Sequence, residues 1–72
     1  MTERILPIAA VDRLIRKAGA PRVSEDAAIE LAQVLEEYGV KIGKRASEFA
    51  VHANRKTVVG SDVRLASKDT TH

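Results

Sequence analysis

The stretch from residue 24 to residue 53 constrains the fold more than any other part of the chain. Ser24 is a good helix N-cap, and Asn54 tolerates the left-handed conformation that often ends a helix. Between them, apolar residues recur at spacings of three and four, which is typical of a buried helical face. They are Ala28, Leu31, Leu35, Tyr38, Ile42, Ala46, Phe49 and Ala53. The stretch predicts one long helix that needs a packing partner.

The rest of the chain is too short to cover this helix. A chain of 72 residues is near the size at which a single hydrophobic core is marginal without further support. It has no cysteine, and its two histidines and its carboxylates show no metal-ligand spacing, so we expect no disulfide, metal or cofactor. The remaining support is a second copy of the chain or a related chain. We therefore predict an obligate dimer.

Two shorter helices are predicted beside the long one. Pro7 suits a first helical turn and Gly19 a helix end, which predicts a helix over residues 7–18. A third helix is expected from residue 60 or 61 to 67, with Asp62 in its first turn. The chain is therefore predicted to be all-α, in the order short, long, short. The expected division is a flexible N-terminus over 1–6, one domain over 7–67 and a disordered tail over 68–72.

Composition and charge narrow the class of protein. Hydrophobic residues make up 44% of the chain and charged residues 31%, which is typical of a folded domain, and no apolar run is long enough to span a membrane. The N-terminus lacks the apolar region of a secretion signal, so we expect a cytoplasmic protein. No nucleophile stands beside a base and no glycine loop is built to hold phosphate, so we expect no enzyme. Because the formal net charge is only +2, the location of the charges must indicate the partner.

The cations lie on the first helix and in two loops. Arg13 and Arg16 are on the polar face of the first predicted helix, and Arg22 is in the short loop after it. Lys56 and Thr57 follow the end of the long helix. Taken one by one, these residues fit a solvated surface as well as a ligand-binding one.

Gly39 and Gly43 lie four residues apart, near the middle of the long helix. A glycine in a helix interior costs about 1 kcal/mol relative to alanine, so the pair needs an explanation. We favour a close crossing by another helix at this point over simple tolerance at an exposed site.

Several stretches taken together resemble the archaeal histones, from about residue 6 to residue 66. The stretches are Leu6-Pro7-Ile8-Ala9, residues 13–19, Arg22-Val23-Ser24, Leu35-Glu36-Glu37, His52-Ala53 and Arg55-Lys56-Thr57 followed by Asp62. The resemblance implies a histone fold, in which two chains clasp head to tail and their long helices cross in an intertwined dimer. The dimer core would include Leu31, Leu35, Tyr38, Gly39, Ile42, Gly43 and Ala46.

The resemblance also implies sequence-nonspecific binding and compaction of double-stranded DNA in archaeal chromatin. The first loop of one chain would lie beside the second loop of its partner. Arg22 would then enter the minor groove and Lys56 and Thr57 would hold the flanking backbone, while Arg13 and Arg16 bind phosphates at the middle of the dimer. Binding of this kind has essentially no base-specific contacts, so its affinity should fall steeply with salt.

Two further roles follow from the same resemblance. Arg55 and Asp62 would form a clamp within the chain that fixes the second loop, although the pair also fits a simple surface ion pair. Phe49, His52 and Asp62 match the positions through which histone dimers join end to end into tetramers or longer arrays. Val59-Gly60 departs from the better-known members, because it lacks a charge and a good helix cap at the edge of the second loop.

An alternative is a histone-fold protein that works mainly by pairing with a different, paralogous chain in a transcription or chromosome-segregation complex. The low net charge favours this alternative, whereas Arg22, Lys56 and Thr57 favour DNA. Under the first hypothesis the protein would be chromosome-associated in the cytoplasm, with DNA and a second histone chain as its partners and no role for a membrane.

Overall fold

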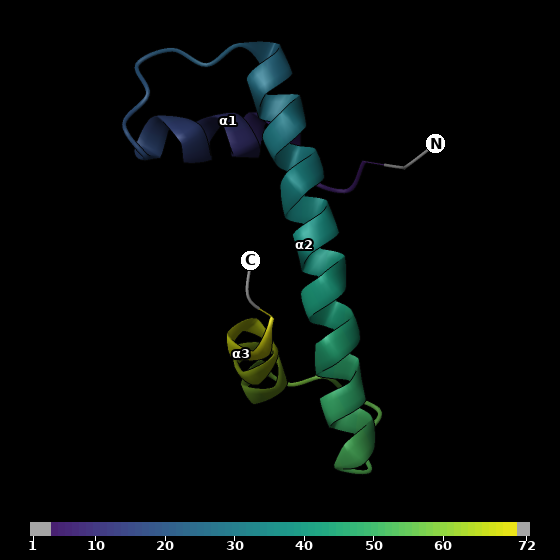
Figure 1. Ribbon diagram of the computed structural model, residues 1–72. Coiled ribbons are helices and arrows are strands. Elements are labelled where there is room, and N and C mark those ends of the chain that lie inside the picture. The colour runs from purple at the N-terminus through teal and green to yellow at the C-terminus, as the bar shows by residue number, and fades with distance from the viewer. Residues whose placement is uncertain (1–3, 71–72) are drawn as a thin grey trace. The chain divides into compact units, whose positions relative to one another are not determined.

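The computed structural model describes residues 4–70, in which three α-helices follow one another along the chain (Figure 1). They are α1 (Ile8–Lys17), α2 (Glu25–His52) and α3 (Gly60–Asp69). The described part contains no β-strand, so the predicted all-α, short-long-short order is confirmed. The chain divides into two compact units, residues 1–37 and 38–72, and α2 contributes to both.

The ends of α1 and α2 lie close to the residues that the sequence indicated. The Ser24 hydroxyl oxygen accepts a hydrogen bond of 3.0 Å from the Ala27 N–H, which caps the N-terminus of α2. Asn54, just beyond the C-terminal end of α2, has a φ of 60°, and Gly19, just beyond α1, has a φ of 121°. Both predicted helix ends therefore have the expected backbone conformation.

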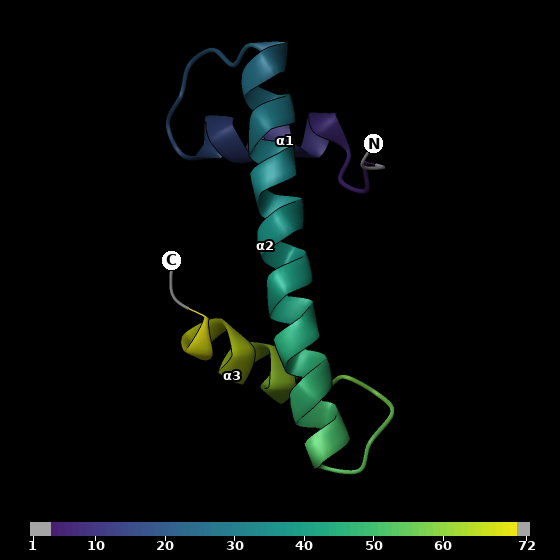
Figure 2. The same cartoon turned by 45° about the vertical axis from the view of Figure 1, so that its right-hand side comes forward.

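The first unit packs α1 against the N-terminal part of α2 (Figures 1 and 2). Val11 of α1 is buried against two alanines, Ala28 and Ala32. Five partly buried apolar residues surround this contact: Leu6, Ile8, Ile15, Val23 and Leu31. Small alanine side chains let the two helices approach closely, so a short α1 is enough to form the contact.

The segment before α1 is held to α2. The backbone N–H groups of Ile5 and Leu6 both donate to one carboxylate oxygen of Glu36, at 2.8 and 2.7 Å. The expectation of a flexible N-terminus over residues 1–6 is therefore wrong for these two residues. Residues 1–3 of that expected segment lie outside the described part of the chain.

The second unit packs α3 against the C-terminal part of α2 through Ile42, Ala46 and Ala66, with Tyr38 and Phe49 at the edge of the contact. Helix α3 continues to Asp69, two residues beyond its predicted end.

The Asp69 carboxylate accepts a hydrogen bond of 2.6 Å from Nε of Arg45, which holds this last turn. The expected disordered tail is therefore wrong for Lys68 and Asp69, while residues 71 and 72 lie outside the described part.

The residues expected in a dimer core differ in exposure. Gly39 and Gly43 are exposed, and a Cβ atom at either would meet nothing within 4 Å. Ala46, by contrast, has no exposure, because α3 of its own chain covers it, and Ile42 is 8% exposed. Ala46 therefore belongs to the core of its own unit and is corrected from the set expected to contact a second chain. The half-buried members are Leu31, Leu35 and Tyr38.

We predict that Gly19→Ala lowers the free energy of unfolding by about 1–3 kcal/mol, because the backbone conformation at φ 121° is strained for a residue with a Cβ atom. Gly60→Ala is the matched control, since Gly60 begins α3 without a positive φ and its surroundings are open. Chemical unfolding followed by circular dichroism at equal protein concentrations compares the two variants. Equal losses in both would contradict the assignment of strain to Gly19.

Candidate nucleic-acid interface

The cations of the first unit are exposed but differ in their partners. Arg13 and Arg22 are exposed. Arg16 donates through Nε to Asp12 Oδ1 at 2.8 Å and through Nη1 to the Pro21 carbonyl oxygen at 3.3 Å. Arg16 therefore ties the end of α1 to the loop that carries Arg22, a role that the sequence analysis missed. The spacing of four residues between Asp12 and Arg16 was the available signal.

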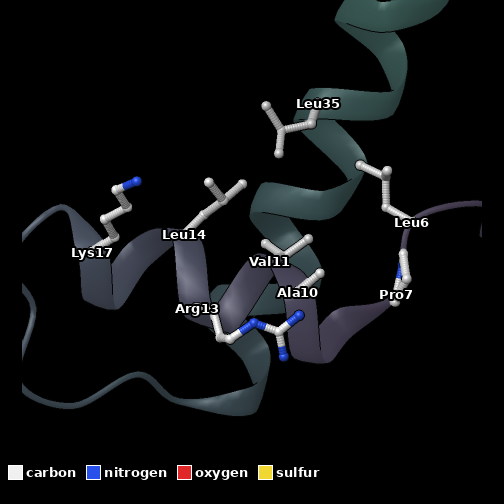
Figure 3. A pocket seen from close by; sticks show the side chains of 8 residues that line it. All are labelled: Leu6, Pro7, Ala10, Val11, Arg13, Leu14, Lys17 and Leu35. Carbon is white, nitrogen blue, oxygen red and sulfur yellow. The ribbon is translucent and has the colours of Figure 1, made fainter.

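An apolar groove of about 550 Å³ runs beside α1 in the first unit (Figure 3). Figure 3 shows Leu6 and Leu14 turned towards Leu35 of α2. The other lining residues are Pro7, Ala10, Val11, Arg13 and Lys17. Its walls offer few polar groups to orient a small ligand, whereas apolar side chains of another protein chain would fit them.

The second loop is fixed by a two-point contact of one guanidinium with one carboxylate. Arg55 donates to the two Asp62 carboxylate oxygens at 2.8 and 3.1 Å and to the Thr57 carbonyl oxygen at 3.2 Å. Asp62 also accepts from the Val59 N–H at 2.9 Å. Val59 occupies the N-cap position of α3 without a side-chain cap, so Asp62 alone joins the loop to the first turn of α3. Lys56 lies exposed on the loop held in this way.

The Asp62 carboxylate stays ionised at unusually low pH. Hydrogen bonds from Arg55, and next from the Val59 N–H, lower the pKa of Asp62 from 3.8 to about 2, against an opposing effect of burial. The residue is only 4% exposed. Because its oxygens are occupied within its own loop, Asp62 offers little surface to another dimer. Its expected direct part in an end-to-end contact is therefore corrected to that of a loop brace.

The other two residues expected in an end-to-end contact lie at the end of α2. His52 is its exposed last residue, and Phe49 is half-buried one turn earlier. The Arg45 guanidinium lies over the Phe49 ring, 4.6 Å from its centroid.

The structure brings candidate residues together only within each unit. The loop of Arg22 belongs to the first unit, and the loop of Lys56 and Thr57 belongs to the second. Across residues 4–70, no three or more carboxylates and imidazoles gather as a metal site would require. In the same range, no helix is both long and apolar enough to cross a membrane.

We predict that Asp62→Asn makes the protein less stable than the unsubstituted chain at neutral pH, because the clamp with Arg55 is lost. The folded-state pKa of Asp62 lies below its ordinary value, so the ionised carboxylate stabilises the fold above about pH 4, and this contribution disappears as the pH falls through about 2. The difference in the free energy of unfolding should shrink across that window. Asp69→Asn, a change at a half-exposed ion pair, is the control and should cause a smaller loss. A difference that does not vary with pH would contradict the prediction.

Known proteins share this sequence over most of its length. The family model of histone-like transcription factors (CBF/NF-Y) and archaeal histones matches residues 4–66. The chain is 70% identical over 63 residues to one of the subunits of archaeal histone HAN1 of Thermococcus zilligii, covering 88% of this chain and 94% of that protein. It is 46% identical over 61 residues to probable archaeal histone 3 of Methanocaldococcus jannaschii, covering 85% of this chain and 91% of that protein.

These matches agree with the three-helix order and confirm the resemblance that the sequence motifs indicated. Proteins of this family are structural DNA-binding proteins, so the expectation that the chain is no enzyme is confirmed. The chain belongs to the family of histone-like CBF/NF-Y transcription factors and archaeal histones, and it has the histone fold.

Proposed function

We propose that the chain forms histone-fold dimers that bind double-stranded DNA without base specificity and bend and compact it. The observation that carries this proposal is the presentation of exposed cations on two braced loops. Arg16 braces the loop of Arg22, and Arg55 with Asp62 braces the loop of Lys56. Loops held in this way present their cations to phosphate with little further ordering.

The charges divide into two groups with different tasks. The guanidinium groups of Arg16 and Arg55 each have a carboxylate partner. Among the described residues, no ion pair involves Arg13, Arg22 or Lys56. We therefore assign phosphate contacts to these three residues, with the exposed Thr57 hydroxyl as a further donor. Counterion release would supply most of the affinity.

The proposed dimer supplies the cover that each chain lacks. The groove beside α1 is apolar, Leu14 is 53% exposed and Val40 is 56% exposed. Gly39 and Gly43 leave room for the backbone of a crossing helix. A head-to-tail pair would also bring Arg22 of one chain beside Lys56 of the other. Assembly of such dimers into tetramers or arrays on the chromosome is part of the proposal.

A heterodimer is the second candidate. The name of the Thermococcus relative describes one lettered subunit of HAN1, which favours pairing with a different chain. The low net charge of +2 favours the same alternative. In that case the DNA-binding loops would be completed by a paralogous chain instead of by a second copy.

We predict that the purified chain alone has the mass of two 7.8 kDa copies by size-exclusion chromatography with light scattering. Gly43→Leu should weaken this dimer, because the new side chain would fill the space proposed for a crossing helix. Lys44→Leu adds the same apolar side chain at the next residue and is the control. A folded monomer of the unsubstituted chain would favour the heterodimer, and an intact Gly43→Leu dimer would contradict a close crossing at Gly43.

We predict that Arg22→Ala lowers affinity for duplex DNA several-fold at moderate salt. It should also reduce the slope of log affinity against log salt by about 1 for each Arg22 lost. Fluorescence anisotropy over a salt series measures both quantities, and circular dichroism checks that the fold is kept. Lys41→Ala removes an exposed cation from α2 outside the loops and should change neither quantity as much. Equal effects of the two substitutions would remove Arg22 from the proposed interface.

A further inference from the structure

A guanidinium held by two carboxylates lies over the single phenylalanine of the chain, within the second unit. Arg45 donates through Nε to Asp69 Oδ2 at 2.6 Å and through Nη1 to Glu48 Oε1 at 2.7 Å. Its guanidinium carbon is 4.6 Å from the centroid of the Phe49 ring. The three contacts join two turns of α2 to the last turn of α3.

This arrangement changes the surface at Phe49. The ring packs against the small core of Ile42, Ala46 and Ala66, and Arg45 lies over it, so Phe49 is only half-buried and partly covered by a charged group. The hydrogen bonds to Glu48 and Asp69 raise the pKa of Arg45, which therefore remains a cation.

A shallow cavity of about 360 Å³ lies at the same place. It is lined by Arg45, Phe49, Leu65, Lys68 and Asp69, and Leu65 is 52% exposed. Without the guanidinium, the Phe49 ring and Leu65 would form a joint apolar patch. Such a patch suits contact with a second copy of the same surface.

We propose that Arg45 is a charged cap on Phe49 that weakens end-to-end joining of dimers at low salt. This inference rests on the proposed function, which assigns Phe49 to the contact between dimers. A contact between two copies of this surface brings two Arg45 side chains to one interface, where they repel each other and lose water.

Salt acts on this cap in a defined direction. The side chain of Arg45 is 41% exposed, and those of Glu48 and Asp69 are 58% and 49% exposed. Exposed ion pairs and like-charge repulsion are both screened as ionic strength rises. Joining of dimers should therefore become stronger with salt, whereas DNA binding becomes weaker.

Sedimentation velocity of the DNA-free protein at about 50 mM and about 500 mM NaCl tests this inference, because the two conditions differ strongly in screening. At the lower salt, Arg45→Ala should strengthen dimer–dimer association by about tenfold, and most of the salt dependence should be lost. Asp69→Asn and Glu48→Gln keep Arg45 but loosen it, so each should shift association in the same direction by less. Lys41→Ala removes a cation one turn earlier on α2 and should leave association unchanged.

The outcomes separate this inference from the proposed function. Dimers whose association is unchanged or weakened by Arg45→Ala would overturn the cap alone, and the Asp69→Asn and Glu48→Gln variants decide the matter if Arg45→Ala does not fold. A wild-type chain that stays monomeric at both salt concentrations would overturn the proposed homodimer and the cap together. DNA affinity of Arg45→Ala dimers should remain close to that of wild type, because Arg45 lies outside the two DNA-binding loops.

Discussion

The scarcity of large buried side chains is the constraint on which the rest of the structure depends. Alanines form most of both small cores, and Val11 is the largest side chain that is fully buried. Because alanine removes little apolar area from water, each unit gains little hydrophobic stabilisation from its own contacts. Larger apolar residues such as Leu14, Val34 and Val40 remain more than half exposed. A second chain is the natural source of the missing burial, which joins stability to assembly.

Local signals in the sequence were enough to predict the helices and their order. Ser24, Asn54 and Gly19 mark helix ends because their side chains, or the lack of one, act on the adjacent backbone. The end of α3 was placed too early, because Asp69 is held by Arg45, 24 residues away. The Glu36 contact with the N-terminal backbone was missed for the same reason. Contacts between distant residues leave no periodic pattern.

The candidate site was predictable to a similar extent. The sequence resemblance named the clamp of Arg55 with Asp62, and the structure contains that contact. It did not show that Asp62 is buried or that Ala46 is covered by α3, because both facts depend on how α3 packs. Exposure therefore sorts residues that a family resemblance treats as one group.

Arginine forms each ion-paired brace in the described part of the chain, and this chemistry explains why the braces differ from the DNA contacts. A guanidinium is planar and has several donors, so one side chain can join two groups, as Arg16, Arg45 and Arg55 do. Lys56 has a compact ammonium group that suits a mobile phosphate contact. Under the proposed function, salt weakens the phosphate contacts and also loosens the Arg45 cap. Binding of DNA and joining of dimers then respond to ionic strength with opposite sign, which allows each step to be measured where the other is weak.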